Sequence, residues 1–130
     1  MADVVITQDP VQDHFHHPRN IGRMDAAAQD VGSALVGAPD QGGVIRLQIR
    51  VDQTGTIIDT RFKAYGCVST IAVASWVSEW LKGKGVDEAS GLRSTRLVRD
   101  LSLPPVKTHC SMLAEDAVRA AVADYKQKQE

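Results

Sequence analysis

The chain has 130 residues, a length that suits one folded domain with a single hydrophobic core. Hydrophobic residues make up 43% and charged residues 24%, which is ordinary for a globular protein, and the net charge of −1 excludes the strongly basic class that binds nucleic acid or anionic membranes. The start Met1-Ala2-Asp3 lacks the pattern of a signal peptide, and no apolar stretch is long enough to span a bilayer. We expect one cytoplasmic domain over residues 1–130, with no nucleic-acid and no membrane partner.

The N-terminal region carries a helix signal followed by histidines. Asp9-Pro10 is typical of a helix start, and we expect a short helix to about Phe15. Three histidines lie at its end and offer either metal ligands or solvated side chains on a mobile terminus: His14, His16 and His17. We favour the solvated interpretation, because chain termini are generally mobile.

The next region predicts three strands. Val31–Val36 reads as a short strand. Within Val44–Val51, aliphatic residues at positions 45, 47, 49 and 51 alternate with polar residues at positions 46, 48 and 50. The range Thr56–Ala64 alternates again after a turn at residues 52–55. These runs indicate an antiparallel sheet, and its polar face predicts that the sheet is covered on one side only.

The loop between the first two strands, Gly37–Gly43, contains three glycines and a proline. Such a loop lets the backbone approach a ligand or partner closely. It is equally consistent with a plain hairpin connection, and composition does not choose between the two.

The second half of the chain is helical. We expect a helix capped by Ser69 or Thr70 and ending near Lys82, apolar over much of its surface, so that it packs on the sheet and on another helix. Its tryptophans, Trp76 and Trp80, are interpreted as core residues. Further helices are expected over the ranges Val86–Gly91, Thr95–Leu101 and Ser111 to about Lys128. The fold class is α+β, a small three-stranded antiparallel sheet with helices packed on one face.

The two cysteines of the chain are candidate ligands. Cys67 follows a strand, and Cys110, after His109, follows a proline-stiffened segment, so that each thiol lies where a helix begins. Free backbone N–H groups and the helix dipole favour a thiolate there. Two thiolates and an imidazole suit zinc or iron, and Asp40 offers an oxygen ligand. On spacing alone, two unrelated buried cysteines are the favoured interpretation.

Three segments change this interpretation of the two cysteines: Val36–Pro39, Arg61–Cys67 and Leu103–Ala117. Together, in this order and spacing, they resemble the IscU/NifU-N family of iron–sulfur cluster scaffolds. The resemblance covers nearly the whole chain and is specific for the fold.

The resemblance implies a scaffold rather than an enzyme. Such a protein accepts persulfide sulfur from a cysteine desulfurase, binds iron and assembles a [2Fe–2S] cluster, with zinc as an occupant of the isolated protein. Cys67 matches the second family cysteine, His109 the histidine, and Cys110 the third cysteine, which receives the persulfide. An Hsp70/J-type chaperone pair, which helps to pass the cluster to iron–sulfur acceptor proteins, would bind the residues Leu103, Pro104, Pro105, Val106 and Lys107. A monomer or weak homodimer is expected.

The sequence differs from the family pattern in the loop Gly37–Gly43. Gln41 stands in the place of the first family cysteine and Gly43 in the place of the family aspartate. An amide is a poor cluster ligand compared with a thiolate.

One hypothesis is therefore a divergent scaffold in which Asp40 joins the three retained ligands. The alternative is an interaction protein, a regulator or persulfide relay that docks the desulfurase and the chaperone without building a cluster. A zinc-dependent sulfur acceptor of the SufU branch ranks last, because that branch keeps all three cysteines. A decayed paralogue conflicts with the intact run Leu103–Ala117.

Overall fold

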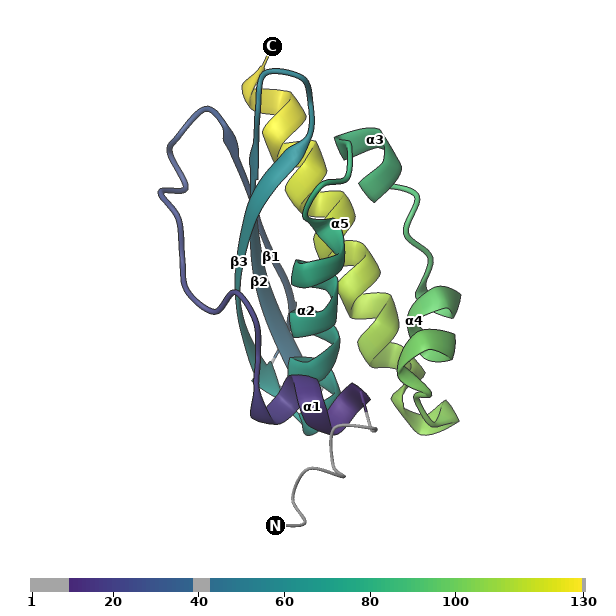
Figure 1. Ribbon diagram of the computed structural model, residues 1–130. Coiled ribbons are helices and arrows are strands. Elements are labelled where there is room, and N and C mark those ends of the chain that lie inside the picture. The colour runs from purple at the N-terminus through teal and green to yellow at the C-terminus, as the bar shows by residue number, and fades with distance from the viewer. Residues whose placement is uncertain (1–9, 39–42, 130) are drawn as a thin grey trace.

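The structure is a computed structural model that describes residues 10–38 and 43–129. It confirms the α+β class, with a three-stranded sheet and a helical layer (Figure 1). The elements, in chain order, are α1 (Pro10–His16), β1 (Val31–Ala38), β2 (Gly43–Val51), β3 (Ile57–Gly66), α2 (Val68–Leu81), α3 (Val86–Ala89), α4 (Ser94–Leu101), the 3₁₀ helix η3 (Pro105–Lys107) and α5 (Thr108–Lys128).

The sheet has the order β1-β2-β3, and both pairings are antiparallel. Leu47 stands opposite Ala34 on β1 and opposite Phe62 on β3, so that these side chains share one face. The strands begin and end close to the predicted positions. β3 begins at Ile57 rather than at Thr56, because Thr56 instead forms an isolated bridge with Gly85.

The helical layer covers the face of the sheet to which Leu47 belongs. Helix α5 packs against β1 and β2, α2 packs against β3, and α1 crosses α2 at the lower end of the molecule in Figure 1. Helices α3 and α4 contact α5. Among the described residues, no helix combines the length and the apolarity needed to cross a membrane.

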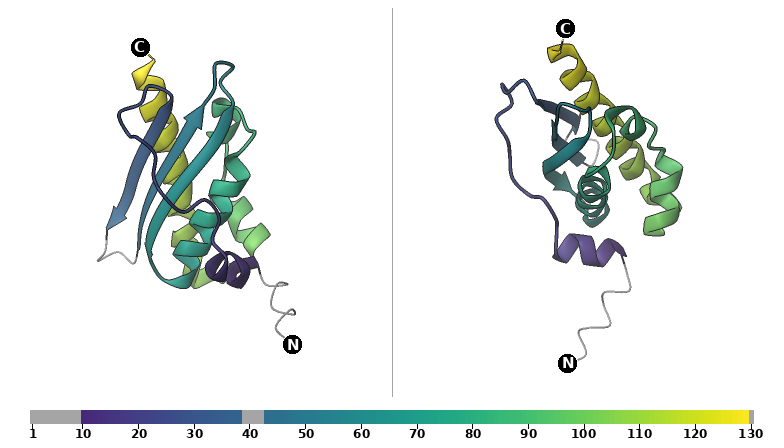
Figure 2. Two further views of the ribbon diagram at one scale, coloured as in Figure 1. Left: turned by 60° about the vertical axis from the view of Figure 1, so that its left-hand side comes forward. Right: turned by 45° about the horizontal axis from the view of Figure 1, so that its top comes forward.

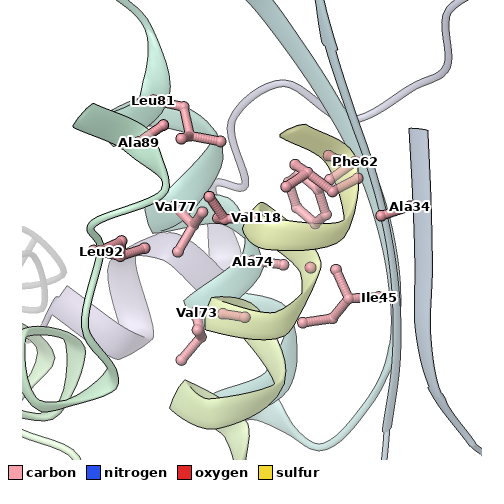
Figure 3. Packing of buried hydrophobic residues seen from close by; sticks show 14 of the residues in the cluster. Ala34, Ile45, Phe62, Val73, Ala74, Val77, Leu81, Ala89, Leu92 and Val118 are labelled. Carbon is pink, nitrogen blue, oxygen red and sulfur yellow. The ribbon is translucent and has the colours of Figure 1, made fainter. Parts of the chain in front are cut away.

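The core lies between the sheet and the two long helices (Figure 3). Ile45 and Phe62 project from the sheet toward Val77 of α2 and Val118 of α5, and each is at most 2% exposed. Burying a side chain of this size contributes about 1.5–3 kcal/mol. The two tryptophans of α2 stack on each other and pack against this core, in agreement with their predicted role.

The opposite face of the sheet is not bare, and the expectation that only one side is covered is wrong. Residues 17–30 cross this face between α1 and β1 (Figure 2). The N–H of Gly22 donates to the Phe62 carbonyl at 3.1 Å, and the N–H of Met24 donates to Gln48 Oε1 at 2.7 Å. Gln48 is consequently only 4% exposed. Polar side chains on this face hydrogen-bond a passing chain instead of water.

Two predicted helix starts are wrong. Helix α5 begins at Thr108 rather than at Ser111, because η3 leads directly into it and the hydroxyl of Thr108 donates to the Pro105 carbonyl at 2.8 Å. The N-cap of α2 is Cys67, with extended backbone, and not Ser69 or Thr70, which are buried inside the first turn. Helix α3 also ends earlier, at Ala89.

The expectation of three solvated histidines is wrong for His14. Its ring is 8% exposed, and Nδ1 lies 2.9 Å from the hydroxyl of Ser75 on α2. Burial lowers the pKa of this imidazole, and the nearby Arg19 lowers it further. The packing of α1 across α2 explains the difference, and only His16 and His17 are exposed.

Candidate functional site

Both cysteines lie at one end of the molecule, where β1 and β3 end and where α2 and α5 begin (Figure 1). Cys67 is the N-cap residue of α2, which confirms its predicted place between a strand and a helix. Cys110 is the third residue of α5 and therefore lies inside the first helical turn rather than before it. The fold thus brings together two thiols that are 43 positions apart.

The two sulfurs are in contact. Cys67 Sγ lies 3.9 Å from Cys110 Sγ. The hydroxyl of Thr70 lies 3.5 Å from Cys67 Sγ and 3.4 Å from Cys110 Sγ, and therefore joins the two thiols. Sequence reasoning treated Thr70 only as a possible cap. Its spacing of three residues from the N-cap is the signal that was available, because it places the hydroxyl beside the N-cap side chain.

The surroundings of Cys67 lower the pKa of its thiol. Partial burial raises its pKa, but hydrogen bonds from the Thr70 hydroxyl and from the backbone N–H groups of Thr70 and Ser69 outweigh burial, and together with Cys110 they lower the pKa to about 7. The side chain is partly exposed. Cys67 is therefore an accessible thiol that is substantially ionised near neutral pH.

The Cys110 thiol has the opposite character. Its residue is 0% exposed, and burial raises its pKa, with Cys67 nearby acting in the same direction against the hydrogen bond from Thr70. The expectation that a helix N-terminus makes Cys110 an accessible thiolate is wrong for this structure, because burial outweighs the helix terminus.

The third predicted ligand is only partly in place. His109 is exposed, and its Nε2 lies 3.5 Å from Cys110 Sγ. Within residues 10–38 and 43–129, no three histidine, cysteine or acidic side chains converge on one point. Asp40, the predicted fourth ligand, and Gln41 lie outside the described residues. The structure therefore brings together two of the four predicted ligands and places the third beside one of them.

A small pocket of about 190 Å³ opens next to His109. Its lining comes from the ends of β1 and β2 and from the first turns of α5: Gly37, Gly43, His109, Met112, Leu113 and Asp116. The open space at this end of the molecule thus reaches the imidazole that contacts Cys110.

Gly43 gives Thr70 the room to stand beside both sulfurs. Gly43 is the first residue of β2, and a Cβ atom placed there would lie 2.9 Å from Thr70 Cγ2, closer than such atoms approach in proteins. Any side chain at position 43 therefore competes with Thr70 for the same space.

The predicted chaperone segment leads into α5. Leu103 is 6% exposed and belongs to the core cluster, whereas Pro104, Pro105 and Val106 are exposed, with Val106 at 76%. The segment is thus anchored at one end and presents three consecutive apolar residues to solvent.

Comparison with known proteins identifies the lineage. The sequence model of the NifU-like N terminal domain matches residues 6–130. The chain belongs to the NifU-like N-terminal domain family. It is 54% identical over 122 residues to the iron–sulfur cluster assembly scaffold protein IscU of Escherichia coli K12, covering 94% of this chain and 95% of that protein. It is 52% identical over 127 residues to the iron–sulfur cluster assembly enzyme IscU of Drosophila melanogaster, covering 98% and 82% respectively.

Solved structures agree with this assignment of the fold. The N-terminal part of a nitrogen-fixing NifU-like protein from Brucella abortus superposes with a TM-score of 0.68 at 15% identity, covering 95% of this chain and 96% of that one. A candidate iron–sulfur cluster assembly scaffold of the SUF system from Fervidobacterium islandicum AW-1 superposes with a TM-score of 0.63 at 17% identity, covering 88% of this chain and 94% of that one. The family resemblance of the sequence is therefore confirmed, and relatives such as the E. coli protein are named scaffolds.

Proposed function

We propose that this NifU-like chain works in iron–sulfur cluster assembly as a divergent scaffold. It takes sulfur from a cysteine desulfurase and holds iron or a [2Fe–2S] cluster as cargo at Cys67, Cys110 and His109. The naming of its relatives as scaffolds supports this role. The observation that carries the proposal is the contact between the two cysteine sulfurs.

The separation of these sulfurs suits one metal ion. Cys67 Sγ and Cys110 Sγ are 3.9 Å apart, and two thiolates bound at about 2.3 Å to one tetrahedral zinc ion lie roughly 3.8 Å from each other. The 3.5 Å between His109 Nε2 and Cys110 Sγ is likewise close to the roughly 3.5 Å expected between a nitrogen and a sulfur on such an ion. Each of these two distances fits such an ion by itself. Binding of one ion by all three residues would therefore draw His109 toward Cys67, and Asp40 would be the fourth ligand.

Delivery of sulfur needs an accessible thiolate. The family resemblance assigns the persulfide to Cys110, but Cys110 is fully buried, whereas Cys67 is partly exposed and has a pKa lowered to about 7. We therefore assign the first transfer from the desulfurase to Cys67. Cys110 then receives or uses sulfur only after Cys67 has been loaded.

Release of the cargo involves a chaperone in this proposal. Leu103–Lys107 would bind an Hsp70-type chaperone with its J-type partner, and the exposure of Pro104, Pro105 and Val106 supports such a contact. The buried side chain of Leu103 ties the segment to the core, so that binding there would pull on the start of α5 and on Cys110.

A second candidate function is a persulfide relay that builds no cluster. The whole sequence contains two cysteines, and no three described ligands converge. A cluster takes about four ligands, most often thiolates, whereas a relay needs one reactive thiol. Both candidates share sulfur acceptance and differ in whether iron and sulfide stay bound.

Anaerobic reconstitution distinguishes them. The chain is incubated with ferrous iron, L-cysteine and a cysteine desulfurase, then desalted, and its absorption spectrum and its iron, zinc and sulfide contents are measured. Charge-transfer bands with bound iron and sulfide, reduced by His109→Ala and Asp40→Ala but not by the exposed His17→Ala, are expected for the scaffold. A colourless chain that carries sulfur on a cysteine contradicts the scaffold and leaves the relay.

A further inference from the structure

We propose that Cys67 and Cys110 form a resolving pair, in which Cys110 cleaves a persulfide on Cys67 and releases sulfide. The inference rests on the proposed function, because it begins with sulfur already accepted at Cys67. Its basis is the direct contact of one accessible and one shielded thiol within the same chain.

The contact places the nucleophile beside the atom it attacks. Cys110 Sγ is 3.9 Å from Cys67 Sγ, and a disulfide brings two sulfurs to about 2.05 Å. The approach required is therefore roughly 2 Å. Loading of Cys67 leaves its own Sγ bonded to Cβ and adds a sulfur beyond it, so that Cys110 still faces the inner sulfur of the persulfide.

The step balances without any added oxidant or reductant. A bond forms between Cys110 Sγ and Cys67 Sγ, and the bond between Cys67 Sγ and the transferred sulfur breaks. The bonding electron pair leaves with the transferred sulfur, which is reduced to sulfide. The two cysteines are oxidised to a disulfide, and the proton of the Cys110 thiol departs with the sulfide.

Burial separates the roles of the two thiols. Cys110 is 0% exposed, so that an external persulfide meets Cys67 first. The Thr70 hydroxyl, within 3.5 Å of both sulfurs, holds the pair together. The sequence contains no third cysteine that could compete for the persulfide.

Formation of the Cys67–Cys110 disulfide and binding of a metal ion by the two thiolates exclude each other. A disulfide has no thiolate to offer an ion, and an ion bound by both thiolates prevents the attack. Loading of the pair with zinc is therefore expected to block sulfide release, whereas the metal-free chain releases it.

Mass spectrometry and sulfide release test the inference. The full-length, metal-free chain is treated anaerobically either with inorganic polysulfide or with L-cysteine and a cysteine desulfurase. We expect the wild type to lose two hydrogens, to give one peptide pair linked through Cys67 and Cys110, and to release sulfide. Cys110→Ser is expected to keep an additional sulfur on Cys67 and to release at least tenfold less sulfide, and Cys67→Ser to take up no sulfur.

The outcomes separate this inference from the proposed function. A wild-type chain that keeps the additional sulfur on Cys67, with no disulfide, overturns the resolving pair and leaves sulfur acceptance standing. Absence of sulfur uptake in every variant overturns both. Circular dichroism checks that Cys110→Ser is folded, and Cys110→Ala serves as a second variant. The wild-type result alone decides the question if neither variant folds.

Discussion

Cys67 and Cys110 each stand at the beginning of a long helix and touch each other, yet their surroundings have opposite effects. At α2 the sulfur is partly exposed and receives hydrogen bonds, and its pKa falls to about 7. At α5 the sulfur is 0% exposed, and burial raises its pKa. The difference teaches that a helix start alone does not make a reactive thiol.

The relative magnitudes explain this outcome. A favourable interaction with a helix terminus is typically worth about 0.3–1 kcal/mol, whereas full burial shifts a pKa by as much as about 3–5 pH units, each worth about 1.4 kcal/mol. The contrast between the two thiols is therefore maintained by the core that shields Cys110. Changes to that core are expected to have larger effects than changes at the thiols themselves.

The largest effect is expected for Phe62→Ala. Phe62 is 1% exposed and lies between the sheet and the helices, so that its loss destabilises the chain by about 3–5 kcal/mol. The loosened core should also expose Cys110 and erase the contrast in thiol reactivity. Denaturant unfolding and thiol labelling measure the two effects. Ile58→Ala, at an exposed position of the same strand, is the control and should change stability by less than about 0.5 kcal/mol.

Alkylation of the unmodified chain measures the contrast directly. With iodoacetamide near pH 7, Cys67 should react more than about tenfold faster than Cys110, because only Cys67 is both accessible and substantially ionised. The Cys67 rate should rise with pH through about 7, as the thiol loses its proton, and should level off above that value. Equal rates for both cysteines in the folded chain would refute the assignment.

Thr70→Val tests the group that links the two sulfurs. Valine keeps the shape but removes the hydroxyl, and we expect the pKa of Cys67 to rise and the chain to lose about 1 kcal/mol. The pH profile of Cys67 alkylation should shift toward higher pH in Thr70→Val. In Thr70→Ser, which keeps a hydroxyl, the profile should stay close to that of the wild type. An unshifted profile in Thr70→Val would assign the lowered pKa to the backbone N–H groups and Cys110 instead.

The smallest effect is expected from His14 of α1, which packs against Ser75 of α2, the helix that begins beside Cys67. Burial lowers the pKa of His14 below its ordinary value of 6.5, so that the unfolded chain binds more protons and stability falls as the pH drops below 6.5. His14→Gln should reduce this pH dependence, and the exposed His17→Gln should leave it unchanged. Denaturant midpoints between pH 5 and 7 provide the measurement. If the denaturant midpoints of His14→Gln and the wild type changed equally with pH, His14 would be ruled out as the origin of this pH dependence.

Much of the fold was predictable because its signals are local. The alternation in Val44–Val51 sets the buried face of the sheet. Helix α2 ends just before Gly83, as expected. The covering of the other face was not predictable, since it depends on Gln48 meeting Met24, a contact across 24 positions with no periodic signal. The burial of His14 has the same cause, because Ser75 lies 61 positions away.

The candidate site shows the same division. The family resemblance selected Cys67, His109 and Cys110, and the structure places the two cysteines in contact. The position of each thiol at a helix start was also read from the sequence. What the sequence did not reveal is which thiol is shielded, because the burial of Cys110 comes from the packing of α5 on the sheet and on α2.

The lack of a side chain at Gly43 has a consequence for restoring the aspartate that the family resemblance assigns to this position. Because a Cβ there would collide with Thr70, a carboxylate cannot be introduced at position 43 without moving the hydroxyl that joins the two sulfurs. Substitutions at positions 43 and 70 are therefore expected to be epistatic. We expect the order of substitution to matter, with the single change Gly43→Asp disturbing the thiol pair and a smaller residue at position 70 permitting it.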